Sequence, residues 1–436
     1  MTTINERAKQ LNEMILEENQ HVYDMLSEKG KRIYFPQKGI LSQTKDATGK
    51  KINATIGTAL EDDGSPMCLD SLWKQLKLAK KNVFSYAPSH GRSEIRNIWK
   101  EMLFKKNPSL VGKEISLPIV TSALTHGLFV AAYLFCEEND IIISPDLYWE
   151  NYDLIFTNSF GGKIITYPIF TSKGFNVDGL KNLLENTAGS KKIIILNFPN
   201  NPTGYTVTYS EALQIRDVLI SCAEKGNDIV VFIDDAYFGL VYDEGILKES
   251  IFCYLSDLHK RILCIKFDGP TKEDYVWGFR VGFVTFGIKN GNQKLYSALE
   301  EKLAGAIRGS ISNASNLGQS LLLTAYNDPL YEKEKQEKYQ IMKERYQKIK
   351  NIFNTKKHYN DFFYPLPFNS GYFMCVRIKN GNAEAVRQKL LDKYDTGVIA
   401  FNDIIRIAFS STPCDLIEKM LDNIYDAARE IENINE

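Results

Sequence analysis

Short apolar runs alternate with longer mixed stretches from about residue 115 of the chain onward. The apolar runs are rich in Ile and Val and are predicted to be strands, at residues 115–120, 141–143, 164–169, 193–196 and 229–233. The stretches between them are predicted to be helices, at residues 124–135, 152–160, 177–184 and 210–225. Strands that alternate with helices are typical of an α/β domain whose mainly parallel sheet is buried on both faces.

The pattern changes after about residue 286, where the strand-rich part ends. Helices are predicted at 292–308 and 313–326, and a long charged helix at 330–353 is expected to connect to a second, smaller α+β unit. Lys alternates with Glu over 333–350, which is typical of a solvated helix face. The second unit contains predicted strands at 372–378, 398–400 and 404–409, and predicted helices at 383–394 and from about 415.

The first 50 residues are polar, with a helix predicted through Leu16 and an irregular stretch predicted at residues 36–51. This N-terminus lacks the apolar core of a signal peptide. No apolar run in the sequence approaches the roughly 20 residues that span a bilayer. We therefore expect no membrane association.

The composition fits a soluble protein with more than one domain. The 436 residues exceed one ordinary domain, and hydrophobic and charged contents of 44% and 25% allow a large core. A formal net charge of −1 gives no electrostatic argument for binding nucleic acid. The seven cysteines are odd in number and scattered, and the five histidines show no ligand spacing. We expect a reduced, cytoplasmic protein without a metal site.

Lys272 and Arg280 form the most informative motif of the chain. They lie eight residues apart in a Gly-containing turn between the apolar runs 261–265 and 281–286. A Lys amine can form a Schiff base with an aldehyde cofactor, and the planar guanidinium of Arg suits forked phosphate binding. Taken alone, Lys272 would more often be a loop lysine on a solvated turn.

Two upstream motifs favour the catalytic interpretation. Residues 200–204 (Asn-Asn-Pro-Thr-Gly) and 234–237 (Asp-Asp-Ala-Tyr) each lie at the end of an apolar run. In open α/β sheets, ligands gather at the carboxyl ends of the strands. The motifs are therefore expected to surround one binding site.

The three motifs, in this order, resemble those of the class I and II aminotransferases, which are pyridoxal 5'-phosphate (PLP) enzymes of fold type I. The resemblance covers about residues 50–415. It implies a large PLP-binding α/β domain at residues 61–325 and a small α+β domain formed by residues 1–60 and 326–436. It also implies a homodimer with shared active sites. The implied activity moves an amino group between an L-amino acid and a 2-oxo acid by a ping-pong mechanism, with Lys272 as Schiff-base lysine and catalytic base.

The resemblance also implies which side chains hold the cofactor's ring. Asp234 would pair with the pyridine nitrogen and keep the ring an electron sink. Tyr237 and Asn201 would donate hydrogen bonds to the ring's 3-oxygen. Trp149 matches the aromatic residue that stacks on the ring, with Tyr148 as the competing candidate and a plain core aromatic as the third alternative.

The phosphate is expected at the turn 122–127, between a predicted strand and a predicted helix. A helix N-terminus offers free amides and a favourable dipole to an anion. Thr125 can add a hydroxyl or act as a simple N-cap, and the two roles are compatible. The phosphate-binding candidates are Ala123, Leu124, Thr125, Thr271, Arg280 and, from the neighbouring subunit, Tyr86.

The substrate is assigned by the same resemblance to Gly57, Asn201, Arg406 and Arg308. Arg406 matches the arginine that binds the substrate's α-carboxylate, for which bidentate geometry is the physical reason. Arg308 lies where aspartate-specific members place an arginine for the side-chain carboxylate, donated across the dimer. The alternative is that Arg308 only caps its own helix, where its charge suits the dipole.

Some positions depart from the family's pattern. Gly269 stands where a serine is usual, the phosphate turn has Ala123 and Leu124 in place of hydroxyl-bearing residues, and Ala59 replaces a common aromatic. These departures leave aspartate, glutamate and aromatic amino acids open as donors. Two other functions remain: a PLP-dependent β-lyase and a non-catalytic PLP-binding regulator. The regulator would carry a DNA-binding module, whereas only about 50 polar residues precede the resemblance.

Overall fold

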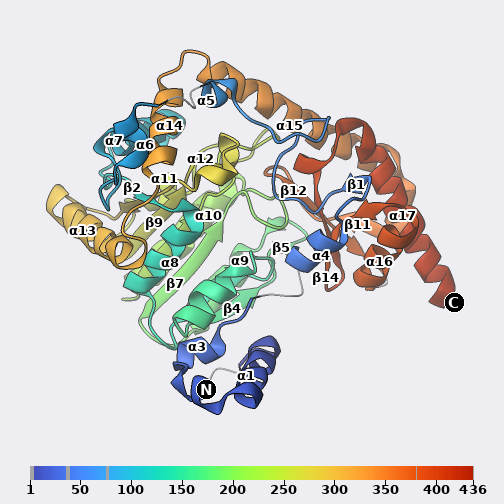
Figure 1. Cartoon of the computed structure of the whole chain (residues 1–436), viewed down its shortest axis with the longest axis horizontal. Coiled ribbons are helices and arrows are strands. Elements are labelled where there is room, and N and C mark those ends of the chain that lie inside the picture. Colours follow the sequence, from blue (N-terminus) through green and yellow to red (C-terminus); the bar gives the residue numbers. More distant parts are fainter. Residues whose placement is uncertain (1–3, 36–39, 75–77, 380, 436) are drawn as a thin grey trace.

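A seven-stranded sheet forms the centre of the molecule (Figure 1). The computed structural model describes residues 4–35, 40–74, 78–379 and 381–435. Strands β3, β4, β7, β8 and β9 run parallel, whereas β10 is antiparallel to both of its neighbours, so the sheet is mixed at one edge. The strand order is β2 (Ile119–Thr121), β10 (Gly282–Gly287), β9 (Ile262–Asp268), β8 (Asp228–Asp234), β7 (Lys191–Asn197), β3 (Ile141–Pro145) and β4 (Lys163–Tyr167).

Helices cover both faces of this sheet, which explains why its central strands are apolar on successive residues. One face packs against α8 (Ala123–Phe135), α13 (Gln293–Ser310) and the π-helix η2 (Asp153–Ser159). The other face packs against α9 (Val177–Asn186), α10 (Tyr209–Glu224) and α11 (Phe252–Leu255). The predicted α/β alternation is therefore confirmed. The first strand is shorter than the predicted 115–120.

A smaller antiparallel sheet lies beside the large one, on the right in Figure 1. Its strand order is β11 (Phe363–Pro365), β12 (Phe373–Ile378), β15 (Ile404–Ala408) and β14 (Ile399–Phe401), and it is accompanied by α16 (Ala383–Lys393) and α17 (Ile417–Asn435). Near it, β1 (Ile52–Asn53) pairs in parallel with β13 (Thr396–Gly397). Segments from both chain ends thus meet here, while the exact domain limits stay a prediction.

The long helix α15 (Tyr331–Thr355) crosses from the large unit to the small one (Figure 1). It follows α14 (Asn316–Tyr326) and passes α5 (Asp70–Trp73). The expected solvated face is present, for example at Lys333 and Glu337, but the helix also has a buried side that contains a charged residue. Arg345 is completely buried, because its guanidinium donates hydrogen bonds to the carbonyl oxygens of Leu60 and Ser410.

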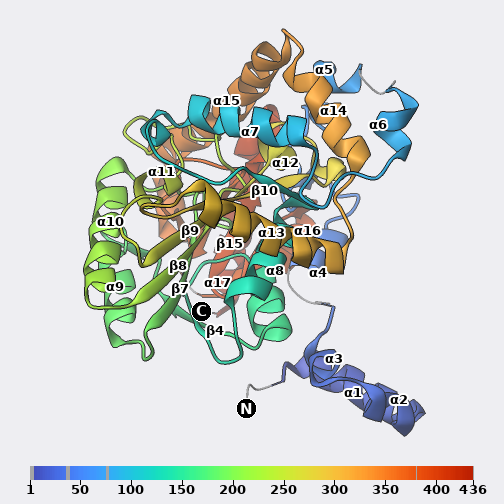
Figure 2. The same ribbon diagram turned by 90° about the vertical axis from the view of Figure 1, so that its left-hand side faces the viewer.

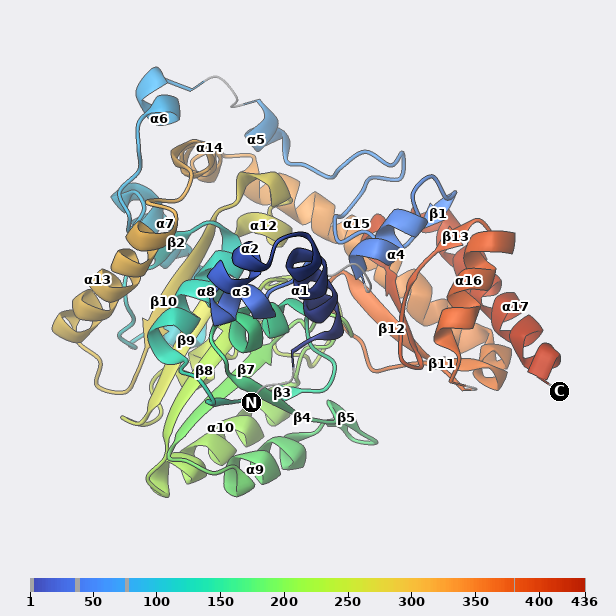
Figure 3. The same cartoon turned by 60° about the horizontal axis from the view of Figure 1, so that its bottom comes forward.

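The N-terminal part contains more helix than the sequence predicted. Helices α1 (Glu6–Glu18), α2 (Gln20–Met25) and α3 (Glu28–Arg32) project from the body in Figure 2 and lie in front of the large sheet in Figure 3. Helix α4 (Ile40–Asp46) falls in the stretch predicted to be irregular, so that prediction is wrong there, and residues 36–39 lie outside the described residues. The helix is held by Gln43, whose amide exchanges two hydrogen bonds with the backbone of Ala400.

Other short elements connect these parts. They are α6 (Lys80–Phe84), α7 (Ser93–Lys106), α12 (Pro270–Glu273), the hairpin β5 (Phe170–Thr171) with β6 (Gly174–Phe175), and the 3₁₀ helices η1 (Pro108–Leu110), η3 (Trp277–Phe279), η4 (Lys357–Asp361), η5 (Phe409–Ser411) and η6 (Cys414–Leu416). Within the described ranges, no helix combines the length and apolar character needed to cross a bilayer.

Candidate active site

A cavity of about 460 Å³ lies between the carboxyl ends of the large sheet's strands and the small sheet. Side chains from both units line it, and Ile40 and Thr44 of α4 line it as well. Twelve of the predicted site residues meet in this cavity: Gly57, Ala123, Leu124, Thr125, Trp149, Asn201, Asp234, Tyr237, Thr271, Lys272, Arg280 and Arg406.

Lys272 enters the cavity from the single turn α12, which follows β9. Burial lowers the pKa of its amine to about 8, with Arg280 adding to the decrease and Asp234 opposing it. The Nζ atom lies 5.1 Å from the centroid of the Tyr237 ring. On the backbone side, the Tyr372 hydroxyl donates a 2.8 Å hydrogen bond to the Lys272 carbonyl. The amine is therefore largely positive at neutral pH but loses its proton more readily than an exposed lysine.

Asp234 ends strand β8 and is 3% exposed. Its carboxylate accepts a 2.6 Å hydrogen bond from the Tyr152 hydroxyl and a 3.1 Å bond from the Ala236 amide. Burial raises the pKa of Asp234, while the Tyr152 hydroxyl and the Lys272 charge counteract this rise. These contacts orient an acidic group toward the cavity and favour its ionised form.

A polar chain links the end of the large sheet to the small sheet. Asn197 lies beside Asp234 in the β7–β8 register, and its side chain donates to the Asp234 carbonyl at 2.8 Å and accepts from the Asn201 amide at 2.8 Å. The Asn201 oxygen in turn accepts a long 3.4 Å bond from Arg406. Asn201 of the large unit and Arg406 of the small sheet thus meet in one cavity.

Arg406 comes from β15 and is 3% exposed. Its guanidinium donates to the Thr55 carbonyl at 3.2 Å and lies 4.3 Å from the centroid of the Phe373 ring. Its buried Nε has no hydrogen-bond partner among the described residues. A buried cation with an unused donor is suited to an anionic ligand such as a carboxylate.

The opposite end of the cavity is built around the N-terminus of α8. The first amides of a helix have no partner inside the helix, and the helix dipole favours an anion there. Ala123 begins the helix with a φ of 60°, a backbone conformation that side-chain-bearing residues rarely adopt. A Cβ atom added to Gly282 would lie 2.7 Å from the Ala123 carbonyl carbon, so only glycine lets β10 approach this turn so closely.

Two more side chains belong to this end. Arg280 lines the cavity from a left-handed backbone position, with a φ of 53°. The buried Thr271 hydroxyl also lines it and has no hydrogen-bond partner within the described part of the chain. Free amides, an unpaired hydroxyl and a guanidinium together form a site suited to phosphate.

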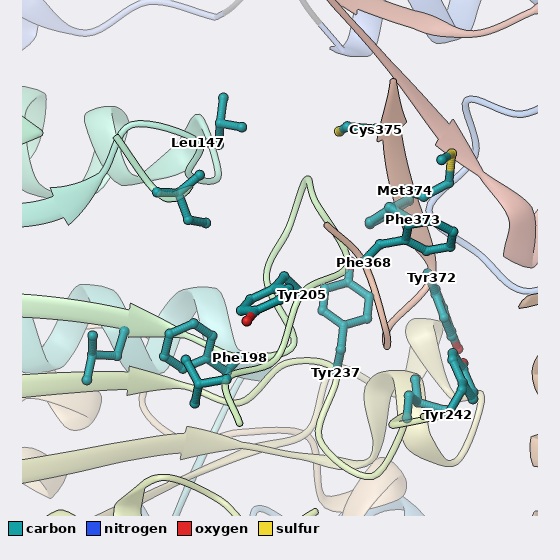
Figure 4. Packing of buried hydrophobic residues seen from close by; sticks show 14 of the residues in the cluster. Leu147, Phe198, Tyr205, Tyr237, Tyr242, Phe368, Tyr372, Phe373, Met374 and Cys375 are labelled. Carbon is teal, nitrogen blue, oxygen red and sulfur yellow. The ribbon is translucent and has the colours of Figure 1, made fainter. Parts of the chain in front are cut away.

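Aromatic rings separate the two sheets beside Lys272. Tyr237 makes edge contacts with Tyr372 and Phe373 of the small unit, at centroid distances of 5.3 and 5.6 Å (Figure 4). On the other side, Trp149 lines the cavity, whereas Tyr148 lines a neighbouring pocket and donates to Asp153. Of the two stacking candidates, the arrangement favours Trp149.

The sequence matches the family described as aminotransferase class I and II over residues 49–424. The chain belongs to this family.

The sequence is also similar to those of individual aminotransferases. The chain is 28% identical to the aspartate aminotransferase of Bacillus subtilis, over 56% of this chain and 57% of the relative. It is 27% identical to the probable N-acetyl-LL-diaminopimelate aminotransferase of the same organism, over 62% and 61%. These alignments span only about three-fifths of each curated relative.

Solved aminotransferase structures share the fold over nearly their whole length. An aminotransferase from Anaerococcus prevotii has a TM-score of 0.82 at 24% identity, covering 93% of this chain and 99% of that one. The cytoplasmic aspartate aminotransferase of Saccharomyces cerevisiae has a TM-score of 0.73 at 18% identity, covering 94% and 100%. The predicted fold type I architecture is thereby confirmed.

Members of the aminotransferase family use PLP. The cavity fits this cofactor on three structural observations: an amine of lowered pKa, a buried carboxylate and an anion site with an unpaired hydroxyl. Lys272 would hold the aldehyde, Asp234 the ring nitrogen, and the α8 N-terminus with Arg280 the phosphate.

Two of the aminotransferase residues predicted from the sequence lie outside the cavity. Tyr86 is 90% exposed. Arg308 lies in the last turn of α13, where it donates a 2.7 Å bond to the Ser312 hydroxyl. This contact fits the alternative in which Arg308 stabilises its own helix end, while the role across a dimer stays a prediction.

Sequence reasoning missed several residues that the structure brings to the site. Asn197 ends a predicted strand and could have been found from that position alone. Tyr152 gave no signal, because its contact with Asp234 depends on how η2 packs on the sheet. Thr44 lines the cavity from a segment that had no assigned role, and Trp277 lines it from within the Lys272–Arg280 motif, where it had no role of its own.

Proposed function

We propose that this protein is a PLP-dependent aminotransferase that moves an amino group between an amino acid and a 2-oxo acid by a ping-pong mechanism. The observation that carries the proposal is the placement of Lys272, an amine with a pKa of about 8, between a buried carboxylate and an anion site. When bound, PLP supplies the electron sink that stabilises a carbanion at the substrate's α-carbon.

The residues of the cavity would bind the substrate, transfer the proton and hold the cofactor. Arg406 and Asn201 bind the substrate's α-carboxylate and orient its α-carbon toward Lys272. The Lys272 amine would act as the base that takes the proton from that carbon and as the acid that returns it. Asp234 would hold a proton on the ring nitrogen of bound PLP, and Tyr237 would donate to the ring oxygen. The aromatic rings around Lys272 help to exclude water.

A half-reaction screen tests this proposal. The purified protein, loaded with PLP, is mixed with each amino acid, and the conversion of the absorbance from the PLP form to the pyridoxamine form is followed. Stoichiometric conversion with release of the matching 2-oxo acid supports amino transfer. Release of ammonia and a β-substituent from substrates such as cystathionine would instead establish a β-lyase, and no reaction with any amino acid would leave a regulator.

We propose a cytoplasmic homodimer whose subunits share residues at each site. All seven cysteines are described and are free thiols, as is usual in a reducing compartment. Exposed aromatic side chains at Phe84, Tyr86 and Tyr133, together with Arg308, would be covered or used by a second subunit.

Hybrid dimers formed from two different variants test whether the subunits share their active sites. Inactive Lys272→Ala, mixed with an equal amount of Tyr86→Ala under conditions of subunit exchange, should recover up to about a quarter of wild-type activity, because half of the dimers carry one intact site. Lys272→Ala mixed with Arg406→Ala should recover nothing, since both residues line the cavity of one subunit. A monomer by light scattering that is fully active would contradict the shared site.

Substrate preference follows from two arginines. Arg406→Ala should raise KM for every amino acid, because each one carries an α-carboxylate. If aspartate or glutamate is the natural donor, Arg308→Ala should cost acidic donors about 2–5 kcal/mol in kcat/KM, the scale for breaking a buried charge pair, and leave neutral donors unchanged. Steady-state kinetics with aspartate, glutamate and phenylalanine measure both effects. Equal losses of kcat/KM for all donors in Arg308→Ala would mean that Arg308 only stabilises its helix end through its contact with Ser312.

A further inference from the structure

Two acidic residues directly follow Lys272 and point away from the cavity that it enters. Glu273 and Asp274 are 4% and 0% exposed, and neither lines the cavity. Their partners are lysines from helices distant in sequence. Glu273 binds Lys106, at the end of α7, and Lys335, in the first turns of α15, whereas Asp274 binds Lys335. We call these four charged residues the Lys335 cluster.

Lys335 is the centre of the cluster. Its amine lies 2.6 Å from a Glu273 oxygen and 2.8 Å from an Asp274 oxygen. Lys106 binds both oxygens of Glu273, each at 2.9 Å. Burial alone would raise the pKa of Glu273, but the two lysines outweigh it and lower the pKa to about 2. The Glu273 carboxylate is therefore held in its charged form between two lysines.

Asp274 has further donors that fix its orientation. The Tyr331 hydroxyl donates to one of its oxygens at 2.8 Å, and the Tyr326 hydroxyl donates to the other at 3.1 Å. The Asp274 amide donates to the Pro270 carbonyl at 2.9 Å, which closes the turn that carries Lys272. The side chain and the backbone of Asp274 thus both act on this turn.

Helix α15, which carries Lys335, also reaches the substrate side of the cavity. Further along α15, Arg345 donates to the carbonyl oxygens of Leu60 and Ser410. Leu60 follows the loop that contains Gly57, and Ser410 follows the strand that contains Arg406. One helix therefore contacts the Lys272 turn through Lys335 and the substrate-binding segments through Arg345.

We propose that the Lys335 cluster is a positioning device for Lys272, which holds the turn of the catalytic lysine in place relative to the residues that bind the substrate. This inference rests on the proposed aminotransferase function. A buried ion pair seldom adds much net stability, because desolvation offsets the attraction, but it can specify one arrangement of the groups around it. Here that arrangement is the backbone of residues 270–276.

The test compares Lys335→Met with Lys338→Met. Lys338 lies on the same helix and also makes an ion pair, with Glu61 at 2.5 Å, but it does not contact the Lys272 turn. Hydrogen–deuterium exchange of the PLP-loaded protein reports on the amides of Asp274 and Val276, which close the turn through hydrogen bonds to Pro270 and Thr271.

In Lys335→Met these amides should exchange at least about tenfold faster, because the turn opens locally more often. The kcat should fall by roughly 10–100-fold with KM nearly unchanged, since a misplaced base affects the chemical step more than substrate binding. Lys338→Met should match the wild type in both measurements. Asp274→Asn keeps the shape of the side chain but removes its charge, and it should show the same changes to a smaller extent; it replaces Lys335→Met if that variant does not fold.

Wild-type exchange of the turn in a folded Lys335→Met or Asp274→Asn would overturn the proposal, as would equal acceleration in Lys338→Met. The exchange measurement does not depend on catalysis. An enzyme that fails the half-reaction screen but shows the selective exchange would refute the proposed function and leave the restraint on the turn intact.

Discussion

Replacing Lys272 with Ala is expected to abolish amino transfer, with a loss of at least about 10⁴-fold, the upper range for removing a positioned proton-transfer group. Both the covalent anchor of the cofactor and the base would be lost. Borohydride reduction of the wild-type protein, followed by peptide mass spectrometry, should place the pyridoxyl group on Lys272. Lys260→Ala, in an exposed turn, is the matched control and should keep full activity. A label on another lysine would contradict the assignment.

The same variant should fold, and its stability has an expected pH dependence. In the cofactor-free protein the pKa of Lys272 lies at about 8, below its ordinary value of 10.5. The unfolded chain binds the proton more tightly, so the amine destabilises the fold fully below pH 8, and this penalty disappears as the pH rises to 10.5. Cofactor-free Lys272→Ala should therefore melt at a higher temperature than wild type at pH 7, and the difference should shrink at alkaline pH.

The second large effect is expected at Asp234. Asp234→Ala should lower kcat by at least about 10²–10³-fold, the scale for losing a preorganised electrostatic partner of the reacting system. It should also weaken PLP binding, because the ring nitrogen would lose its counter-ion. Near-normal turnover would show that another group, such as Asp235, pairs with the ring.

Tyr152→Phe is a milder change at the same site, because it removes one hydrogen bond to Asp234 and keeps the carboxylate. A hydrogen bond to a charged group contributes about 1.5–3 kcal/mol, so kcat should fall by roughly 10–150-fold. The Tyr152 hydroxyl counteracts the rise in the pKa of Asp234. Its removal should raise that pKa further and shift the acidic limb of the kcat profile to higher pH.

The sequence predicted the parts of the fold that depend on local pattern. Runs such as 229–233 are apolar on successive residues because β8 is buried on both faces, and that signal survives without tertiary information. The motif residues at strand ends could also be found from local pattern, because ligands bind at the carboxyl edge of a parallel sheet. Twelve of the predicted site residues line one cavity, and some of them, such as Gly57, Trp149 and Arg406, were assigned only through the resemblance to the aminotransferases.

What the sequence did not reveal depends on contacts between distant segments. Helix α4 forms where Gln43 binds the backbone of Ala400, more than 350 residues away. Lys335 lies in a run of alternating charges that looks solvated, and only the fold brings it to Glu273 and Asp274. The roles proposed for Tyr86 and Arg308 involve a second subunit, so the structure of a single chain does not test them.

The course of α15 also affects how this protein could be divided. A fragment that ended at residue 325 would retain the large sheet, Lys272 and the phosphate site. It would lose Tyr326, Tyr331 and Lys335, and with them these three side-chain donors to the Asp274 carboxylate. The segment after residue 325 therefore contributes more than Arg406, because its Lys335 also supplies a counter-charge to carboxylates buried beside the large sheet.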